Sequence, residues 1–258
     1  MRAMWSGSLV FGLVNIPVKL YSATEEHTPQ FDFLHKKDLS PIRYAKVCKS
    51  EGEEVPSDEI VKGFEYRKGE YVVMTDEDFE RASPRRSRAV EVVEFVQVDE
   101  IDSVYFEKPY YLEPDRGADK AYALLREALR KSGKVGIAKY MIRNRERIGA
   151  VKPDGDVLVL NQLRYKDEVR QAEGLKLPAS EQADGKEMDL ALTLIDHLTE
   201  SFDPAAFKDT YSDELRTMIE QKAEGREIAP VGEAPEPTKV VDLMETLKAS
   251  LEKAKKAA

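Results

Sequence analysis

The stretch SLVFGLVNIPVKL, residues 8–20, carries leucine, valine, phenylalanine and isoleucine in the density expected of a buried pair of strands. Within it, Gly12 or the segment 15–17, which ends in Pro17, can mark a bend or bulge between the two strands. This opening predicts that the chain begins with β-structure.

Further strand candidates follow at short intervals, with polar breaks between them. They are residues 69–75, 88–98, 104–112, 134–143 and 156–164. In residues 88–98, the side chains of Val90, Val92, Val96 and Val98 share one face, with Glu94 as the exception. Several strands of this length separated by short polar segments predict a barrel or a sandwich.

A helical pattern interrupts these strands once, and helices dominate the second half of the chain. Residues 117–132 place Tyr122, Leu125 and Leu129 at helical spacing, and Gly133 is a suitable stop. Two more apolar stripes predict helices over residues 184–202 and 211–224. The first stripe comprises Met188, Ala191, Ile195, Leu198 and Phe202, and the second comprises Tyr211, Leu215, Met218 and Ile219.

Residues 225–237 contain prolines and glycines with few apolar side chains, which is typical of an extended, poorly packed linker. Thr238 can then cap a last helix whose apolar stripe is Val240, Leu243, Met244, Leu247 and Leu251. We therefore expect a core over residues 1–224, a linker over 225–237 and a C-terminal helix over 238–258. That helix can dock back on the core or on a partner, and the tether favours the partner.

The composition of the 258 residues, 41% hydrophobic and 34% charged, fits a chain with a sizeable core. No apolar run approaches the roughly 18 residues that span a bilayer. Asn15 and Pro17 interrupt the N-terminal apolar stretch, so a β-strand explains this stretch better than a signal peptide does. Cys48 is the only cysteine, which excludes an intrachain disulfide and a thiolate metal cluster. We expect a cytoplasmic protein without a membrane partner.

The formal net charge of −9 argues against a nucleic-acid partner when it is taken alone. The charges are segregated, however, because residues 35–49, 81–88 and 134–152 carry net charges of +4, +4 and +5, and residues 180–203 are acidic. Each run can be a solvated face. The arginines of residues 81–88 have no acid among them, and guanidinium geometry suits phosphate, so the pattern predicts an anion-binding surface.

The common catalytic motifs are absent from the sequence, including phosphate-binding glycine loops, zinc-protease helices and nucleophile elbows. Two alternatives stay open. Asp99, Glu100 and Asp102 can hold Mg²⁺ in a metal-dependent nuclease, and a barrel bearing the aromatic residues of 104–111 can bind single-stranded nucleic acid without end specificity. A solvated acidic turn and a barrel core explain these residues more simply, so we expect no enzyme activity, no metal and no cofactor.

Long motifs along the chain are those of one known family. They are FGLVNIPVKLYSATE (11–25), EVPSDEIVKGFEY (54–66), TDEDFE (75–80), SRAVEVVEFV (87–96), IDSVYFEKPYYLEPD (101–115), KAYALLREAL (120–129), FDPAAFKDTY (202–211) and VVDLMETLKASLE (240–252). The chain resembles bacterial Ku, the DNA-end-binding protein of non-homologous end joining, over nearly its whole length and in order.

The resemblance implies a mainly β fold with helices: a Ku-core β-barrel with a bridge arm and a C-terminal helical arm, assembled as a ring-shaped homodimer. It implies sequence-independent binding of double-stranded DNA ends at the nucleoid. It also implies recruitment and stimulation of the bacterial ATP-dependent DNA ligase D by the C-terminal segment. Two departures stand out. Glu51 occupies the second position of the CxxC pair that many members carry at Cys48, and the long lysine-rich tail is reduced to Lys253, Lys255 and Lys256.

The family indicates the regions that contact DNA, and charge indicates the residues. The candidates are Arg81, Arg85, Arg86 and Arg88 of the bridge, the flanking Lys62 and Lys108, then Arg43 and Lys46, and last Arg143 and Arg145. The residues expected to face the ligase are Val240, Leu243, Met244 and Leu247. We expect dimerisation to bury the two helical stripes with part of the bridge. The basic runs are expected to converge on one concave surface.

Overall fold

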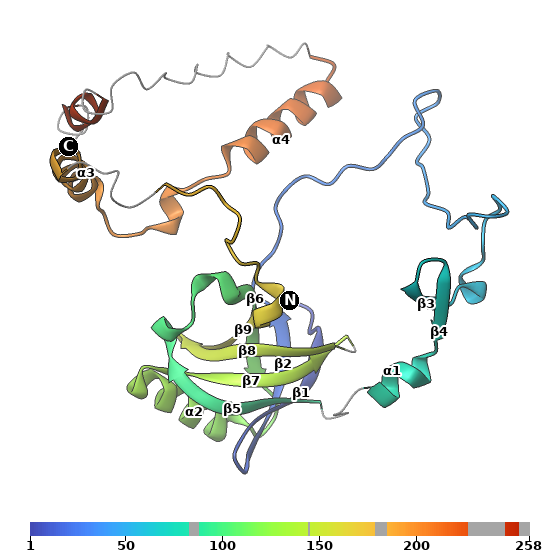
Figure 1. Cartoon of the computed structure of the whole chain (residues 1–258), viewed down its shortest axis with the longest axis horizontal. Helices are drawn as coiled ribbons and strands as arrows, with labels where there is room; N and C mark the ends of the chain where they lie inside the picture. The colour runs from blue at the N-terminus through green and yellow to red at the C-terminus, as the bar shows by residue number, and fades with distance from the viewer. Residues whose placement is uncertain (83–87, 144, 179–184, 227–245, 253–258) are drawn as a thin grey trace. The chain divides into compact units, whose positions relative to one another are not determined.

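The computed structural model describes residues 1–82, 88–143, 145–178, 185–226 and 246–252 (Figure 1). The chain divides into two units. The first comprises Met1–Glu26 and Asp32–Gln171, and the second comprises His27–Phe31 and Ala172–Ala258. Each unit is described by itself.

A closed β-barrel forms the body of the first unit. Its strands are β1 (Trp5–Phe11), β2 (Val14–Ser22), β5 (Ala89–Gln97), β6 (Phe106–Pro114), β7 (Lys134–Ile142), β8 (Arg145–Asp154) and β9 (Val157–Leu163). They close in the order β1-β2-β6-β9-β8-β7-β5. Every neighbouring pair is antiparallel except β1 and β5, where Leu9 lies opposite Val90 in a parallel pair. The predicted barrel is confirmed.

Alternate residues of these strands fill a common interior. Leu9, Ile16, Leu112 and Leu158 have no exposed surface. A second apolar cluster lies on the outer face of the sheet, where residues Val135, Ala150 and Leu163 pack under the short helices η2 (Val98–Glu100) and η3 (Ser103–Tyr105). The aromatic segment 104–111 belongs to both clusters, with Tyr110 inside the barrel and Tyr105 and Phe106 outside it. These rings are core, as the simpler interpretation held.

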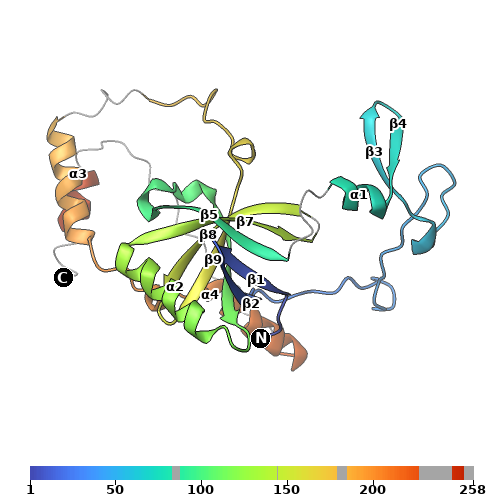
Figure 2. The same cartoon turned by 90° about the horizontal axis from the view of Figure 1, so that it is seen from below.

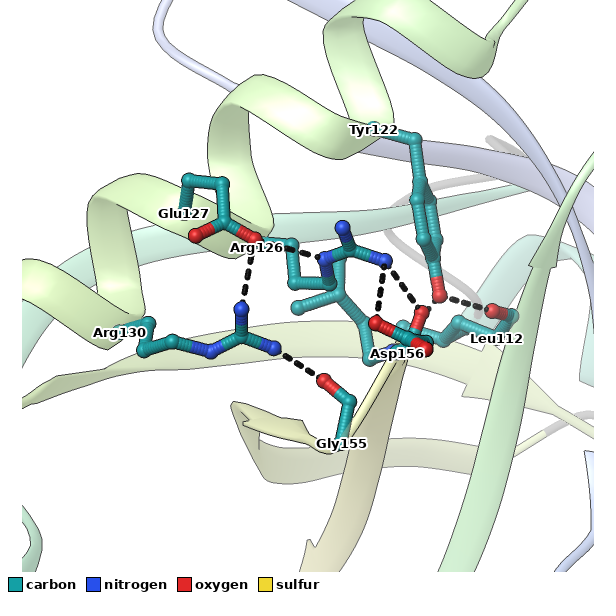
Figure 3. A network of polar contacts seen from close by, with 8 residues as sticks. Leu112, Tyr122, Arg126, Glu127, Arg130, Gly155 and Asp156 are labelled. Carbon is teal, nitrogen blue, oxygen red and sulfur yellow. Dashed lines mark hydrogen bonds and ion pairs between the residues drawn. The ribbon is translucent and has the colours of Figure 1, made fainter.

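Helix α2 (Asp119–Ser132) lies against the barrel strands in both views (Figures 1 and 2). Its buried residues Tyr122, Leu125 and Leu129 join the interior cluster. The Tyr122 hydroxyl donates to the Leu112 carbonyl at 2.6 Å and accepts from the Leu158 amide at 2.6 Å (Figure 3). The helix therefore closes the end of the barrel interior at which Leu112 and Leu158 lie.

Two arginines tie the outer side of α2 to the β8–β9 turn (Figure 3). Arg126 donates to the Asp156 carbonyl at 2.6 Å, and Arg130 donates to the Gly155 carbonyl. Both guanidinium groups also pair with Glu127, at 3.1 and 2.8 Å. This network fixes the rotation of α2 on the barrel, and it leaves these two arginines engaged with the protein itself.

An arm leaves the barrel between β2 and β5. Its elements are the bridges Leu34↔Pro41 and Val47↔Glu54, η1 (Ser57–Glu59), β3 (Lys62–Arg67), β4 (Glu70–Met74) and α1 (Asp76–Ala82). Strands β3 and β4 pair with one another in a sheet of their own. None of the residues of β3, β4 and α1 is buried. The prediction of a strand over 69–75 holds as β4, whereas its partner β3 and the helix α1 were not predicted.

The second unit contains α3 (Gly185–Leu198), η6 (Pro204–Ala206) and α4 (Thr210–Ala223), as the apolar stripes predicted. Phe202 lies beyond α3, where its ring stacks on Phe207 at 5.9 Å. Residues 246–252 are helical, and Leu247 lies in that helix. The predicted linker 225–237 begins in the described part of the chain but continues beyond it, and Val240, Leu243 and Met244 lie outside the described residues.

None of the described helices combines the length and the apolar character that crossing a membrane requires.

Candidate nucleic-acid interface

The inward-facing residues of the barrel change from apolar to charged with distance from α2. Three strands show this change in order from the α2 end. The inward-facing residues are Leu112, Tyr110 and Lys108 on β6, then Leu158, Leu160 and Gln162 on β9. On β8 they are Val151, Gly149, Arg147 and Arg145. In the registers, Lys108 lies opposite Gln162, Gln162 lies opposite Gly149, and Arg147 lies opposite Tyr140 further along β8. The end of the barrel away from α2 is therefore polar and cationic.

A cavity of about 460 Å³ occupies this end, and we call it the barrel-mouth pocket. Its lining residues are Met4, Glu107, Lys108, Tyr110, Ile142, Arg143, Arg145, Arg147 and Gln162. The lining thus contains four cations and a single carboxylate. A concave site with a few convergent polar groups is the usual form of a ligand site.

A hydrogen-bonded row lies across the floor of this pocket. The buried Tyr140 hydroxyl donates to Gln162 Oε1 at 3.3 Å, and Gln162 Nε2 donates to Glu107 Oε2 at 2.8 Å. Arg164 Nη1 lies 3.3 Å from the same Glu107 oxygen. Burial raises the pKa of Tyr140, which keeps its hydroxyl protonated as a donor at neutral pH. The one carboxylate of the pocket is thus held by Gln162 and Arg164.

The cations of the pocket are largely uncompensated. In the described part of the chain, Lys108, Arg143 and Arg145 make no salt bridge with an acid. Arg147 has a distant partner in Glu168, at 3.8 Å. The Lys108 ammonium lies 5.9 Å from the centre of the Tyr110 ring. Like charges gathered in one pocket attract an anion, which relieves their mutual repulsion.

The charges also act on a buried tyrosine of the same pocket. Burial raises the pKa of Tyr110, while Arg143 and Arg147 lower it and Glu107 raises it. Arg143 has a backbone φ of +51°, in the left-handed region that non-glycine residues rarely adopt. Arg143 lies in the two-residue connection between β7 and β8, where hairpin turns commonly require a positive φ.

Three residues that the sequence singled out meet in this pocket: Lys108, Arg143 and Arg145. Sequence reasoning missed Arg147, although it lies in the same basic run. The signal that identifies it is the alternation of Arg145, Arg147 and Gly149, which places both arginines on the inward side of β8.

The remaining candidates lie on the arm or beside it, and several are paired with acids. Arg43 pairs with Glu54 at 2.9 Å, and Lys62 pairs with Asp76 at 3.1 Å. Arg81 lies 3.7 Å from Glu77, one helical turn away. From the sequence, we predicted that the arginines of residues 81–88 have no acid nearby. This was wrong for Arg81, because Glu77 lies one turn before it in α1.

Lys46 and Arg88 are exposed. The Arg88 carbonyl accepts from the Ser8 amide at 2.9 Å, which fixes its backbone at the start of β5. Arg85 and Arg86 lie outside the described residues. The convergence of the basic runs of the arm and of the barrel on one concave surface therefore stays a prediction.

The acidic residues weighed for a nuclease have structural roles. The Glu100 side chain accepts from the Gln97 amide at 2.8 Å, and Asp102 accepts from the Val104 amide at 3.0 Å, so both cap short helices. Among the described residues, no group of histidine, cysteine and acidic side chains is arranged to hold a metal ion.

A closed barrel with a cationic mouth, on a chain whose positive charge is concentrated in a few runs, favours the class of nucleic-acid-binding proteins. The family described as "Ku70/Ku80 beta-barrel domain" matches residues 10–190. The chain therefore belongs to the Ku family.

Curated relatives resemble this chain over nearly its whole length. The non-homologous end joining protein Ku of Bacillus subtilis is 43% identical over 99% of this chain and 83% of its own length. The proteins of the same name from Opitutus terrae and Heliobacterium modesticaldum are each 42% identical, over 97% and 98% of this chain and 91% and 92% of their own lengths. These relatives place the chain among the bacterial Ku proteins of non-homologous end joining.

Proposed function

We propose that two copies of this chain form a ring that encloses the end of a broken DNA duplex without reading its sequence. The observation that carries the proposal is the similarity to bacterial end-joining Ku proteins over nearly the full chain. A free end can enter a closed ring, whereas an internal stretch of duplex cannot, so selectivity for ends is topological. Chromosomal DNA as the ligand implies action in the cytoplasm, at the nucleoid.

Phosphate contacts supply the affinity in this proposal. The contacting residues are Arg81, Arg85, Arg86, Arg88, Lys62, Lys108, Arg43, Lys46, Arg143 and Arg145. Contacts to phosphate and sugar position a protein on DNA but carry no sequence information. The absence of base-reading motifs from the sequence and the presence of segregated basic runs support this mode of binding.

A second copy of the chain is the proposed partner of the exposed apolar surfaces. On the β3–β4 hairpin, Phe64 and Tyr71 are 66% and 62% exposed. An isolated two-stranded hairpin is marginally stable in water, so an apolar partner surface stabilises it. In α3, Ile195 and Leu198 are also exposed, and no residue of that helix is buried. These surfaces support a homodimer in which the arm and the helical stripes are covered.

The C-terminal helix over 238–258 is the proposed docking site for DNA ligase D, with Val240, Leu243, Met244 and Leu247 facing the ligase. Truncation after Pro237 is expected to leave DNA binding unchanged and to abolish stimulation of the ligase. Loss of DNA binding in the truncated protein would mean instead that the helix docks on the core.

The proposed function is tested by equilibrium binding to short blunt-ended duplexes of unrelated sequence and to the matching single strands, with sedimentation of the free protein. We expect equal affinity for all duplexes, weaker binding to single strands, and a dimer at micromolar concentration. A preference for single strands would favour the single-strand-binding alternative, and a stable monomer would contradict the ring.

A further inference from the structure

The barrel-mouth pocket has the dimensions of a site for one small group. Its volume, about 460 Å³, falls in the range of small-molecule sites, roughly 300–1,000 Å³. A cavity of this size admits a single phosphate group, either from the duplex backbone or from a strand end. A small anion, or the end of a chain, can enter it.

The chemistry of the pocket fits a group with more than one negative charge. Lys108, Arg143 and Arg145 carry three cations without a salt bridge in the described part of the chain, and Arg147 adds a fourth. A terminal phosphate carries close to two charges and three acceptor oxygens at neutral pH, whereas a phosphodiester carries one charge. Guanidinium groups bind phosphate oxygens in pairs of hydrogen bonds.

The floor of the pocket is made of buried, hydrogen-bonded side chains. Gln162 is 5% exposed and Tyr140 is 3% exposed, and both lie in the hydrogen-bonded row that holds Glu107. Gln162 and Arg164 contact the Glu107 carboxylate, and in the described part of the chain none of the four pocket cations forms a salt bridge with it. The row therefore keeps the pocket cationic and fixes the strands that carry its arginines.

We propose that the barrel-mouth pocket binds a dianionic terminal phosphate group through Lys108, Arg143, Arg145 and Arg147. The phosphate has two possible sources, the terminus of a broken DNA strand or a small free phosphate such as pyrophosphate. The first source rests on the proposed function, because it requires that the protein bind DNA ends. The second does not depend on it.

The experiment compares three duplexes of one sequence, which carry a phosphate at the 5′ end, at the 3′ end, or at neither end. Dissociation constants are measured by fluorescence anisotropy for the full chain, and pyrophosphate binding is measured separately by calorimetry. If the pocket takes a strand terminus, one phosphorylated duplex binds about tenfold more tightly than the unphosphorylated one, as a charge-assisted hydrogen bond implies.

Matched variants assign the effect to the pocket. Arg145→Gln and Lys108→Gln each remove one pocket charge from an exposed side chain, so the fold is expected to survive. Arg116→Gln makes the same change of charge at the turn before α2, outside the pocket. The two pocket variants are expected to lose the phosphate preference or the pyrophosphate binding, and Arg116→Gln is expected to keep both.

The outcomes separate the two sources and the two proposals. Preference for a phosphorylated duplex that disappears in the pocket variants supports the strand terminus. Pyrophosphate binding that disappears in the same variants, without any preference among duplexes, supports the free phosphate. If neither effect is seen, or if Arg116→Gln removes it equally, the inference is wrong. A protein that binds no duplex but binds pyrophosphate in the pocket would contradict the proposed function alone.

Discussion

The hydroxyl of Tyr122 joins three elements through two hydrogen bonds. It donates to the Leu112 carbonyl on β6 and accepts from the Leu158 amide on β9, both at 2.6 Å. All three residues are buried, and Leu112 and Leu158 lie opposite one another in the β6–β9 ladder, so the hydroxyl links two paired strands. A buried backbone group without a partner is costly, and one phenol oxygen therefore stabilises the closed end of the barrel.

Tyr122→Phe is expected to reduce the free energy of unfolding by about 1–3 kcal/mol, because it removes two buried hydrogen bonds. Urea denaturation measures the effect. Tyr21→Phe is the control, since the Tyr21 hydroxyl bonds to Glu113 at an exposed position. A control variant that costs as much as Tyr122→Phe would show that the barrel end does not depend on this bond.

Arg85 and Arg86 are the proposed phosphate contacts of the bridge. The double variant Arg85→Ala, Arg86→Ala is expected to weaken binding equally on all duplex sequences and to lower the log–log salt slope by about 0.9 for each phosphate that the protein no longer neutralises. Titrations over a range of salt concentration measure both effects. The variant Lys120→Ala, Lys131→Ala removes the same charge from α2, and it is expected to keep the slope. Weaker binding on some sequences alone would contradict a phosphate contact.

The family resemblance indicated the regions and charge indicated Lys108, Arg143 and Arg145 as candidates, and these side chains do meet in one pocket. Charge could not identify the floor of that pocket. Gln162 and Tyr140 become functional candidates because strand registers bring positions from β7, β8 and β9 together. The pairing of strands that are far apart in the chain cannot be read from a local sequence pattern, whereas the charge of each side chain can be read directly.

At the scale of elements, α2 ends at Gly133, because glycine adopts the left-handed backbone conformation without steric cost. Gly133 has a φ of +65°, in the left-handed region that ends many helices, and β7 begins at the next residue. A Cβ atom at this position would meet no other atom within 4 Å. The cost of a substitution here is therefore the backbone conformation alone.

Gly133→Ala is expected to reduce the free energy of unfolding by about 1 kcal/mol, because alanine disfavours the left-handed region. Gly133→Asn is the matched variant, since asparagine tolerates this conformation, and it is expected to retain most of the stability. Both values come from urea denaturation. Equal losses of stability in the two variants would mean that something other than backbone conformation matters at this position.

Helix α4 has a titratable cap. The Asp209 carboxylate accepts from the Ser212 amide at 3.0 Å and from the Ser212 hydroxyl at 2.6 Å. These bonds from Ser212, through its side chain and then its backbone, lower the pKa of Asp209 below its ordinary value of 3.8. A lowered pKa in the folded state means that the stabilisation is complete above the ordinary value and is lost as the pH falls through the folded value.

We therefore expect the first turn of α4 to lose protection from hydrogen exchange below about pH 3.8. Asp209→Asn keeps a capping side chain without a titrating proton, so its protection is expected to lack this pH dependence. The ratio of exchange rates in the two proteins at each pH isolates Asp209. A constant ratio across the acid range would contradict the prediction.

Elements with a strong apolar period were predictable, and those without one were not. The stripe of Tyr122, Leu125 and Leu129 predicted α2. Strand β8 was missed because its inward positions at the mouth are Arg145 and Arg147 rather than apolar residues. Strand β3 was missed because it is short and all six of its residues are exposed, with Phe64 and Tyr66 as its two aromatic side chains. Charged inward positions and full exposure thus explain why these two strands were not predicted.

At the scale of the whole molecule, the net charge of −9 and the affinity for DNA that we propose are compatible because charge is local. The pocket concentrates four cations at one end of the barrel. The acidic residues of 180–203 lie in a different unit of the chain. In the proposed dimer, the acidic surfaces would disfavour DNA everywhere except where the basic residues gather.

The central claim is that a closed ring accepts DNA through a free end. The most direct measurement is competition for binding between a linear duplex and a covalently closed circle of the same length and sequence. We predict that the linear duplex displaces a labelled duplex efficiently and that the relaxed circle does not. Equal displacement by the circle would contradict threading, and would assign the basic residues to an open surface that binds duplex DNA along its length.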